Sequence, residues 1–195
     1  QNALRTGIRQ RIGEGASFSG NERNRAFFQS SALHYEDLSL ISGLDLVADG
    51  RAFALTDLDR DGGVDVVVVN ANAPLLQVLR NQIAAEQGYV VVKLEGGNTT
   101  AEVSSEWSAR DGVGASITLR ARGVRTIREL RVGEGLAAQN SHALIFGLGS
   151  EEAADEVVVT WPSGRTQIAE RVEAGSQVLF REIGEVLVSR YSATD

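Results

Sequence analysis

The chain has 195 residues, of which 43% are hydrophobic and 23% charged, with 21 Gly, 2 Pro and no Cys. This composition excludes a wholly disordered chain, a disulfide framework and a thiolate metal site, and no apolar run reaches the about 18 residues of a membrane-spanning helix. The formal net charge of −7 excludes nucleic acid as an expected partner, because an acidic surface repels it at long range.

The first elements along the chain are a loose N-terminal arm over residues 1–19 and then short strands. The apolar run Ala52–Leu55 is followed by an Asp-rich loop and by Val66–Val69, which we expect to be a strand buried on both faces. A short helical turn is expected near residues 75–80. We place a domain boundary near Glu86-Gln87-Gly88, where the composition changes.

Beyond this boundary the runs 89–94 and 156–161 both predict buried strands, and a second short helical turn is expected near residues 151–155. Residues 115–122 alternate, with Ile117, Leu119 and Ala121 predicted to face inward. Ile127 falls out of phase with the apolar residues that follow it. Either a β-bulge restores the phase or Ile127 is exposed. Trp161 is expected in the core.

No stretch shows a sustained helical period, so the predicted class is all-β, with sheets packed on sheets. The expected organisation is an arm over 1–19, a first domain over 20–88, a second over 89–183 and a C-terminal extension over 184–195.

The sharpest chemical signal is the loop Asp57–Asp65, which reads Asp-Leu-Asp-Arg-Asp-Gly-Gly-Val-Asp. Carboxylates this close repel one another unless a cation lies between them, and Ca²⁺ takes alternating oxygen ligands of this kind. The predicted ligands are the side chains of Asp57, Asp59, Asp61 and Asp65, with the backbone of Gly63 as a further candidate.

This loop is not an EF-hand. The twelfth position, where an EF-hand has a bidentate Glu, is Val68, and strands rather than helices flank the loop. Asp65 is therefore the predicted closing ligand of a β-loop-β calcium site. The alternative is a solvated acidic turn without an ion.

The segment Gly50–Asn70, which contains this loop, resembles the FG-GAP/VCBS repeat of integrin-like β-propellers. Residues 24–28 and 79–81 resemble the strand of that repeat that ends near Asn, and residues 35–44 resemble its Asp-Val-Ser and Ser-Gly-Leu stretch. The resemblance implies one propeller-blade-like antiparallel sheet with a calcium loop over residues 20–88.

The second half resembles the ASPIC/UnbV domain that follows such repeats in the cartilage acidic protein 1 family. The motifs that carry the resemblance are Arg110–Ala115, Arg131–Gly135, Gln139–Ser141, Phe146–Gly149 and Trp161–Arg165. Gly112 departs from the pattern, since the family usually has a small apolar residue there. The resemblance implies a β-sandwich-like domain in a secreted or periplasmic calcium-binding protein, and it does not imply an enzyme.

A propeller needs at least four blades of about 40–45 residues, and residues 20–88 provide one. We therefore expect a short member of the family, the loss of the other blades, or a partner that covers the open strand edges. Because the chain contains no Met and begins at Gln1, we also expect a processed chain whose secretory signal has been removed, or a fragment of a longer protein.

Two weaker candidates for contact with a protein or glycan are an arginine group and one tryptophan. The arginines are Arg120, Arg122, Arg125 and Arg128, with Arg131 close by. They form an anion-binding patch or the solvated face of a hairpin. Trp107 lies in a polar stretch, where it stacks on a sugar, contacts a partner or packs locally.

No constellation of residues indicates catalysis. Ser141 and His142 are adjacent, so a strand would point them to opposite faces, and no spacing selects a pair of carboxylates. We expect a non-enzymatic, calcium-binding extracellular or periplasmic protein that binds another macromolecule in adhesion or assembly. The alternatives are a carbohydrate-binding module and a structural subunit of a larger surface or periplasmic complex.

Overall fold

The computed structural model describes residues 6–7, 10–11, 14, 16–17, 19–31, 33–83 and 87–192. The rest of the predicted arm, Glu86 at the predicted boundary and residues 193–195 of the predicted extension lie outside the described residues. The chain forms two compact units. The first contains the residues up to Ala54, with Val66–Leu79 and Gly135–Ala138, and the second contains Leu55–Asp65, Arg80–Glu134 and the residues from Gln139 on. The Asp-rich loop therefore belongs to the second unit.

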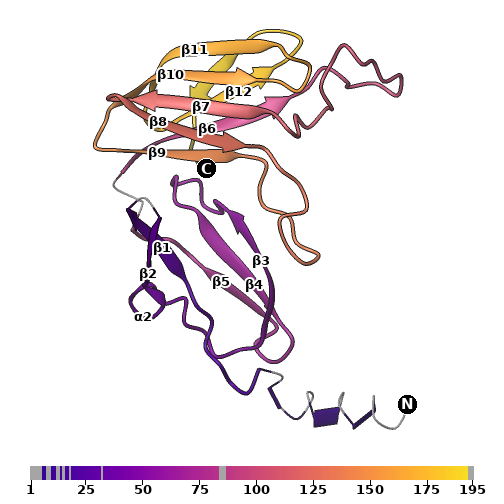
Figure 1. Cartoon of the computed structure of the whole chain (residues 1–195), viewed down its shortest axis with the longest axis vertical. Helices are drawn as coiled ribbons and strands as arrows, with labels where there is room; N and C mark the ends of the chain where they lie inside the picture. The colour runs from indigo at the N-terminus through magenta and orange to yellow at the C-terminus, as the bar shows by residue number, and fades with distance from the viewer. Residues whose placement is uncertain are drawn as a thin grey trace. The chain divides into compact units, whose positions relative to one another are not determined.

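Strands dominate the described residues, which confirms the predicted all-β class (Figure 1). The N-terminal half has a two-stranded antiparallel sheet, β1–β2, and a three-stranded sheet in the order β3–β4–β5. Their bounds are β1 Phe27–Ser31, β2 His34–Asp37, β3 Gly50–Thr56, β4 Asp65–Asn70 and β5 Leu76–Leu79, with a short helix α2 at Ser39–Ser42. Within the described part of the chain, no helix has the length and apolar character to cross a membrane.

Strand β4 is buried less than its run of valines predicts. Val68 is 8% exposed, but Val69 is 46% exposed and pairs with Leu76 of β5, which is 58% exposed. One face of this sheet is therefore open to solvent, and the prediction that Val66–Val69 is buried on both faces is wrong. The predicted helical turn near residues 75–80 is also wrong, since these residues form β5.

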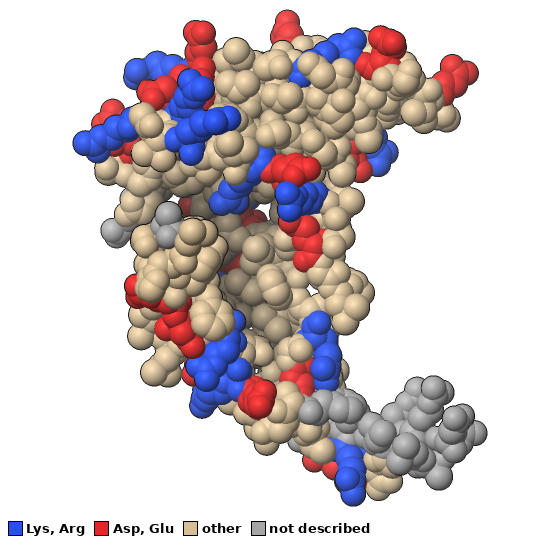
Figure 2. Space-filling view, viewed as in Figure 1, with Lys and Arg blue, Asp and Glu red and all other residues tan. Residues whose placement is uncertain are grey.

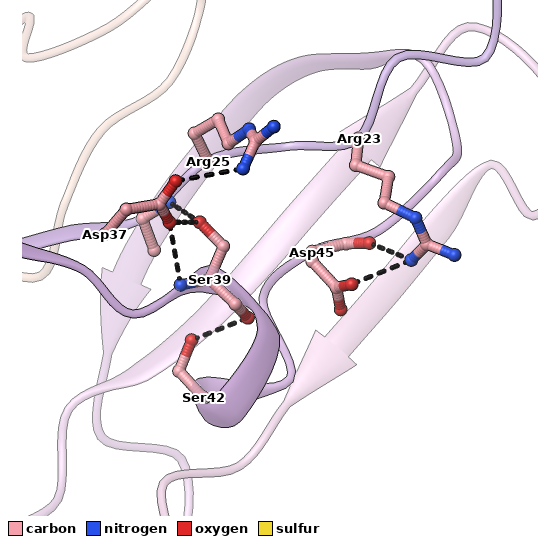
Figure 3. Close-up of polar contacts among 7 residues, drawn as sticks. Arg23, Arg25, Asp37, Ser39, Ser42 and Asp45 are labelled. Carbon is pink, nitrogen blue, oxygen red and sulfur yellow. Dashed lines mark hydrogen bonds and ion pairs between the residues drawn. The ribbon is translucent and has the colours of Figure 1, made fainter.

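Helix α2 is anchored by polar contacts around Asp37 (Figure 3). The Asp37 carboxylate accepts hydrogen bonds from the Ser39 hydroxyl and from the Ser39 backbone N–H at 3.0 Å, and it pairs with Arg25 at 2.9 Å. The hydrogen bonds from Ser39 hold the pKa of Asp37 below its usual value. Arg23 makes a second ion pair with Asp45 at 2.7 Å. These contacts fix the turn that follows β2.

The second unit contains a sandwich of two four-stranded sheets, as Figure 1 shows. One sheet has the strand order β11–β10–β7–β8 and the other β13–β12–β6–β9. All neighbouring strands are antiparallel except β6 and β12, which are parallel. The bounds are β6 Gly88–Glu95, β7 Ser116–Ala121, β8 Val124–Glu129, β9 Leu144–Gly149, β10 Ala153–Thr160, β11 Thr166–Glu173, β12 Ser176–Arg181 and β13 Leu187–Arg190. The helical turn predicted near residues 151–155 is wrong, because residues 151–152 form no helical turn and β10 begins at Ala153.

The core of this unit lies between the two sheets. Ile117, Leu119 and Ala121 of β7 are all at most 8% exposed, which confirms the predicted inward face. Trp161 is 2% exposed, as predicted, and its Nε1 donates a hydrogen bond to Gln167 at 2.9 Å. The large buried surface of these side chains is the main source of stability for the sandwich.

The phase of β8 is settled by its pairing with β7. The register continues without a bulge, and Ile127 is 53% exposed, so the second of the two predicted alternatives is correct. The inward position is taken by Arg128, which lies opposite Ile117. Its guanidinium lies 5.5 Å from the centroid of the Phe146 ring, and burial lowers the pKa of Arg128.

Candidate metal centre

The Asp-rich loop joins the end of β3 to the start of β4, so its carboxylates converge on a tight turn. Gly62 has a φ of +87°, a left-handed conformation that glycine adopts without steric cost. Asp57, Asp59 and Asp61 each offer one carboxylate oxygen, and these atoms lie within 4.8 Å of one another. The structure thus brings together three of the four predicted calcium ligands.

Backbone N–H groups of the loop orient two of these carboxylates. Asp57 accepts hydrogen bonds from the N–H of Asp61 at 3.2 Å and of Gly62 at 2.9 Å, and Asp61 accepts one from Gly63 at 2.7 Å. The N–H groups concentrate partial positive charge on one side of the loop and stabilise the ionised carboxylates. The loop is therefore preorganised around its acidic side chains. The proposed role of the Gly63 backbone as a ligand stays a prediction.

Asp65 lies outside the cluster of three. It is 1% exposed, and its two oxygens accept hydrogen bonds from the backbone N–H of Leu58 at 2.9 Å and of Asn81 at 2.8 Å. Both oxygens are thus engaged in closing the loop and in tying it to the chain after β5. Asp65 therefore closes the loop through these hydrogen bonds, and its predicted role as the closing ligand stays a prediction.

The two carboxylate oxygens of Asp59 indicate whether the cluster fits a cation. One of its oxygens, Oδ2, pairs with Arg80, while the other, Oδ1, is buried and has no hydrogen-bond partner in the described part of the chain. A buried carboxylate oxygen without a partner is costly. A hard divalent cation would supply the missing partner and offset the repulsion among three carboxylates. The donor set therefore fits Ca²⁺, which prefers oxygen ligands of this type.

Two tyrosines of the second unit, Tyr89 and Tyr191, contact the loop. Tyr89 and Tyr191 pack edge to face with ring centroids 6.1 Å apart, and the guanidinium of Arg60 lies 5.9 Å from the Tyr191 centroid. Burial raises the pKa of Tyr191 to about 12, with smaller contributions from the charge of Asp57 and from a hydrogen bond with Asp57. The phenol therefore stays protonated beside the carboxylate cluster.

Trp107, a predicted contact residue, is engaged within its own unit. The guanidinium of Arg165 lies 3.7 Å from the centroid of the indole ring and also donates a hydrogen bond to the Glu106 carbonyl. A Cβ on Gly97 would come within 2.7 Å of the Trp107 side chain, so this glycine lets the indole pack closely. Local packing accounts for the position of Trp107.

The predicted arginine group is divided between the two faces of the β11–β10–β7–β8 sheet. Arg120 and Arg122 pair with Glu156 at 3.2 Å and Glu151 at 3.0 Å, while Arg128 points inward. Arg125 lies opposite Arg120 in the β7–β8 register. Figure 2 shows basic and acidic side chains next to one another on one face of the molecule. The structure therefore does not bring the four predicted arginines into one patch.

No local pattern in the sequence predicts a buried carboxylate at Glu182, which is 6% exposed. Glu182 accepts hydrogen bonds from the backbone N–H of Gly97 and Ser108, both at 2.8 Å, and from the hydroxyls of Ser108 at 2.9 Å and Ser163 at 2.5 Å. Burial alone would raise its pKa, but these hydrogen bonds outweigh it and leave the pKa lowered. Glu182 thus fastens the long loop after β6 and the short turn between β10 and β11 to the end of β12.

Comparison with known protein families finds a match in the second half of the chain. Residues 105–186 match the sequence family described as ASPIC and UnbV. This region contains most of the sandwich, including the motifs at Arg110–Ala115 and Trp161–Arg165. No curated protein matches the chain.

At Gly112, where the chain departs from the family pattern, the backbone itself requires glycine. Its φ is +69°, and a Cβ would come within 2.7 Å of the Leu94 Cβ. A side chain at this position would therefore be strained and would also collide with the core.

Proposed function

We propose that this protein is a calcium-binding, non-catalytic protein that works outside the cell or in the periplasm by binding another macromolecule. The observation that carries the proposal is the convergence of Asp57, Asp59 and Asp61 around a buried, unpartnered oxygen of Asp59. Carboxylates in this arrangement suit a hard cation that takes about six to eight oxygen ligands.

The ion has a structural role in this proposal. The loop connects β3 with β4, and Gly62 at its tip lies directly against Tyr89 at the start of β6. A cation that neutralises the carboxylates would stabilise the turn and the strand ends that it joins. The resemblance of residues 50–70 to an FG-GAP/VCBS repeat, followed by a region that matches the ASPIC and UnbV family, supports the same role.

A macromolecular partner is supported by the apolar surface of the first unit. Large apolar side chains are more than 40% exposed on its strands, on α2 and on its loops. They are Phe27, Phe28, Leu33, Tyr35, Leu40, Ile41, Val47, Phe53, Val69, Leu75, Leu76, Val78 and Leu136. Exposed apolar surface of this extent is typical of a protein–protein contact.

The calcium proposal is tested by thermal unfolding with and without a chelator. We expect the chelator to lower the melting temperature of the wild type, and the double variant Asp59→Ala plus Asp61→Ala to lose this dependence. The matched control is Glu170→Ala plus Glu173→Ala, which removes two acids from β11 and should keep the calcium response. A wild-type melting curve that the chelator leaves unchanged would contradict the proposal.

The partner proposal is tested by native purification and mass spectrometry of the proteins that co-purify. A partner with a defined stoichiometry should be lost in the variant Leu76→Asp plus Val78→Asp, which places charges on the open face of β5. The variant must keep the calcium-dependent melting of the second unit. If it retains the partner at the original stoichiometry, the open face is not the contact.

A further inference from the structure

We propose that a pocket beside the Asp-rich loop binds a small ligand with a carboxylate or similar oxyanion group, which Lys93 and Arg60 hold. The pocket lies within the second unit and has a volume of about 740 Å³. This volume is within the range of about 300–1,000 Å³ found for small-molecule sites. Lys93 of β6 and Arg60 of the loop both line it.

The carboxylates that line the pocket already have partners. Asp57 accepts hydrogen bonds from two backbone N–H groups of its own loop. Asp111 pairs with Arg110 at 3.2 Å, and Glu95 pairs with Arg181 at 3.2 Å. Asp111 and Glu95 are therefore held in ion pairs, whereas the backbone hydrogen bonds of Asp57 leave its negative charge in place.

Lys93 and Arg60 remain without a carboxylate partner in the described part of the chain. Arg60 lies over the Tyr191 ring and donates a hydrogen bond of 3.5 Å to the Ser192 carbonyl, and neither contact neutralises its charge. Two cations that form no ion pair therefore line one pocket. An anionic group bound there would gain two charged partners, and neutralisation of the nearby Asp57 would strengthen the attraction.

The chemistry of the lining indicates how such a ligand is held. The guanidinium of Arg60 can donate two parallel hydrogen bonds to an oxyanion, and the ammonium of Lys93 acts as a compact charge. The hydroxyls of Thr99 and Ser141 also line the pocket as neutral donors. Leu179, which pairs with Lys93 across β6 and β12, adds an apolar side chain to the lining. The pocket thus suits a small molecule that has one anionic group and a short uncharged remainder.

One consequence rests on the proposed function. Asp57 lines the pocket and also belongs to the candidate metal centre, so a bound calcium ion would add positive charge beside the ligand. Calcium should then strengthen anion binding. The pocket and its two cations do not require the ion, so anion binding can be measured in its absence.

The sequence offers a sharp experiment, because Lys93 is the only lysine in the chain. Reductive methylation with ¹³C-formaldehyde labels Lys93 and the α-amino group and keeps their charge. Titration of the labelled protein with succinate, and separately with sulfate, should move the Lys93 resonance in a saturable way and leave the α-amino resonance in place. The two anions distinguish a planar carboxylate from a tetrahedral oxyanion.

The affinity is then compared among variants by calorimetry. Lys93→Gln and Arg60→Gln should each weaken binding about tenfold, as expected for the loss of one charge-assisted contact. The control is Arg171→Gln, which removes an equal charge from an exposed ion pair with Glu173 and should bind as the wild type does. An equal loss in the control, or a Lys93 resonance that shows no saturable shift with either anion, would overturn the inference.

The two proposals fail in distinguishable ways. Saturable anion binding in a protein whose melting does not respond to a chelator would remove the calcium proposal and keep the anion site. A calcium-dependent melting temperature without saturable anion binding would remove the anion site alone.

Discussion

Gly62 at the tip of the Asp-rich loop lies directly against the ring of Tyr89, so that a Cβ on Gly62 would come within 2.1 Å of Tyr89 Cδ1. The same glycine has a φ of +87°, which an L-residue rarely adopts. The absence of a side chain therefore serves two purposes. It permits the turn that gathers the carboxylates, and it lets the loop pack on the tyrosine pair of the second unit.

We expect Gly62→Ala to lower the free energy of unfolding through both effects. The left-handed backbone costs an alanine about 1–2 kcal/mol, and the collision with Tyr89 adds about 1–3 kcal/mol. Urea denaturation measures the total. Gly123→Ala is the control, because its φ is +76° and no heavy atom lies within 4 Å of the added Cβ. Equal losses in the two variants would show that the packing against Tyr89 has no energetic weight.

Asp59 and Asp65 are expected to respond differently to substitution when a chelator is present. Asp65→Ala leaves the N–H groups of Leu58 and Asn81 without their acceptor, which costs about 1–3 kcal/mol. Asp59→Ala removes an unpartnered buried oxygen and reduces like-charge repulsion, so it should cost little under the same conditions. Urea denaturation in excess chelator measures both. If Asp59→Ala costs as much as Asp65→Ala, Asp59 has a structural role without calcium.

The different placement of these two aspartates illustrates what spacing can predict. Alternate carboxylates followed by glycine predicted the convergence of Asp57, Asp59 and Asp61, because a tight turn places alternate side chains on one side. Spacing could not tell that the ninth residue would accept hydrogen bonds from Leu58 and Asn81. That outcome depends on the path of the chain after β5, which no local pattern encodes.

The fold was predictable where one face of a strand is apolar. Alternation in β7 identified Ile117 and its inward neighbours, because the side chains of a strand alternate between two faces. The same rule left β8 ambiguous, since its inward position holds Arg128 instead of an apolar residue. Val69 was misjudged because a run of valines does not show whether a second layer covers the sheet.

Glu182 lay beyond prediction because its partners are distant in sequence. Its donors come from residues 97, 108 and 163, in two separate loops. We expect Glu182→Gln to lower the free energy of unfolding by about 3 kcal/mol, since an amide cannot accept all of these hydrogen bonds. Glu95→Gln is the control, because Glu95 and its partner Arg181 are each 43% exposed and should lose less than about 1 kcal/mol. Similar losses in both variants would contradict a special role for the buried carboxylate.

The stabilisation by Glu182 should also depend on pH. Burial opposes ionisation of this carboxyl, but the hydrogen bonds from Ser163, Gly97 and Ser108 prevail, and its folded-state pKa lies below the ordinary value of 4.5. A lowered pKa gives stability that is present above pH 4.5 and lost as the pH falls through the folded-state pKa. The difference between the wild type and Glu182→Gln should therefore be constant near neutral pH and shrink in acid. Urea denaturation over a pH series measures this difference, and one that grows in acid would refute the assignment.

Arg128 is expected to lower the free energy of unfolding slightly and to oppose self-association of the chain. It lies on β8, at the edge of its sheet, with its guanidinium over the Phe146 ring at 5.5 Å, and burial lowers its pKa. Because Arg128 is still exposed to solvent, replacing this partly desolvated cation with an apolar side chain should raise the free energy of unfolding by less than about 1 kcal/mol in Arg128→Leu. An inward charge on an edge strand also opposes pairing with other chains, so the variant should self-associate in sedimentation experiments. Arg125→Leu, on the outward face of the same strand, removes the same charge and should gain no stability. A loss of stability in Arg128→Leu would show instead that the contact between the guanidinium and Phe146 outweighs the cost of burying the charge.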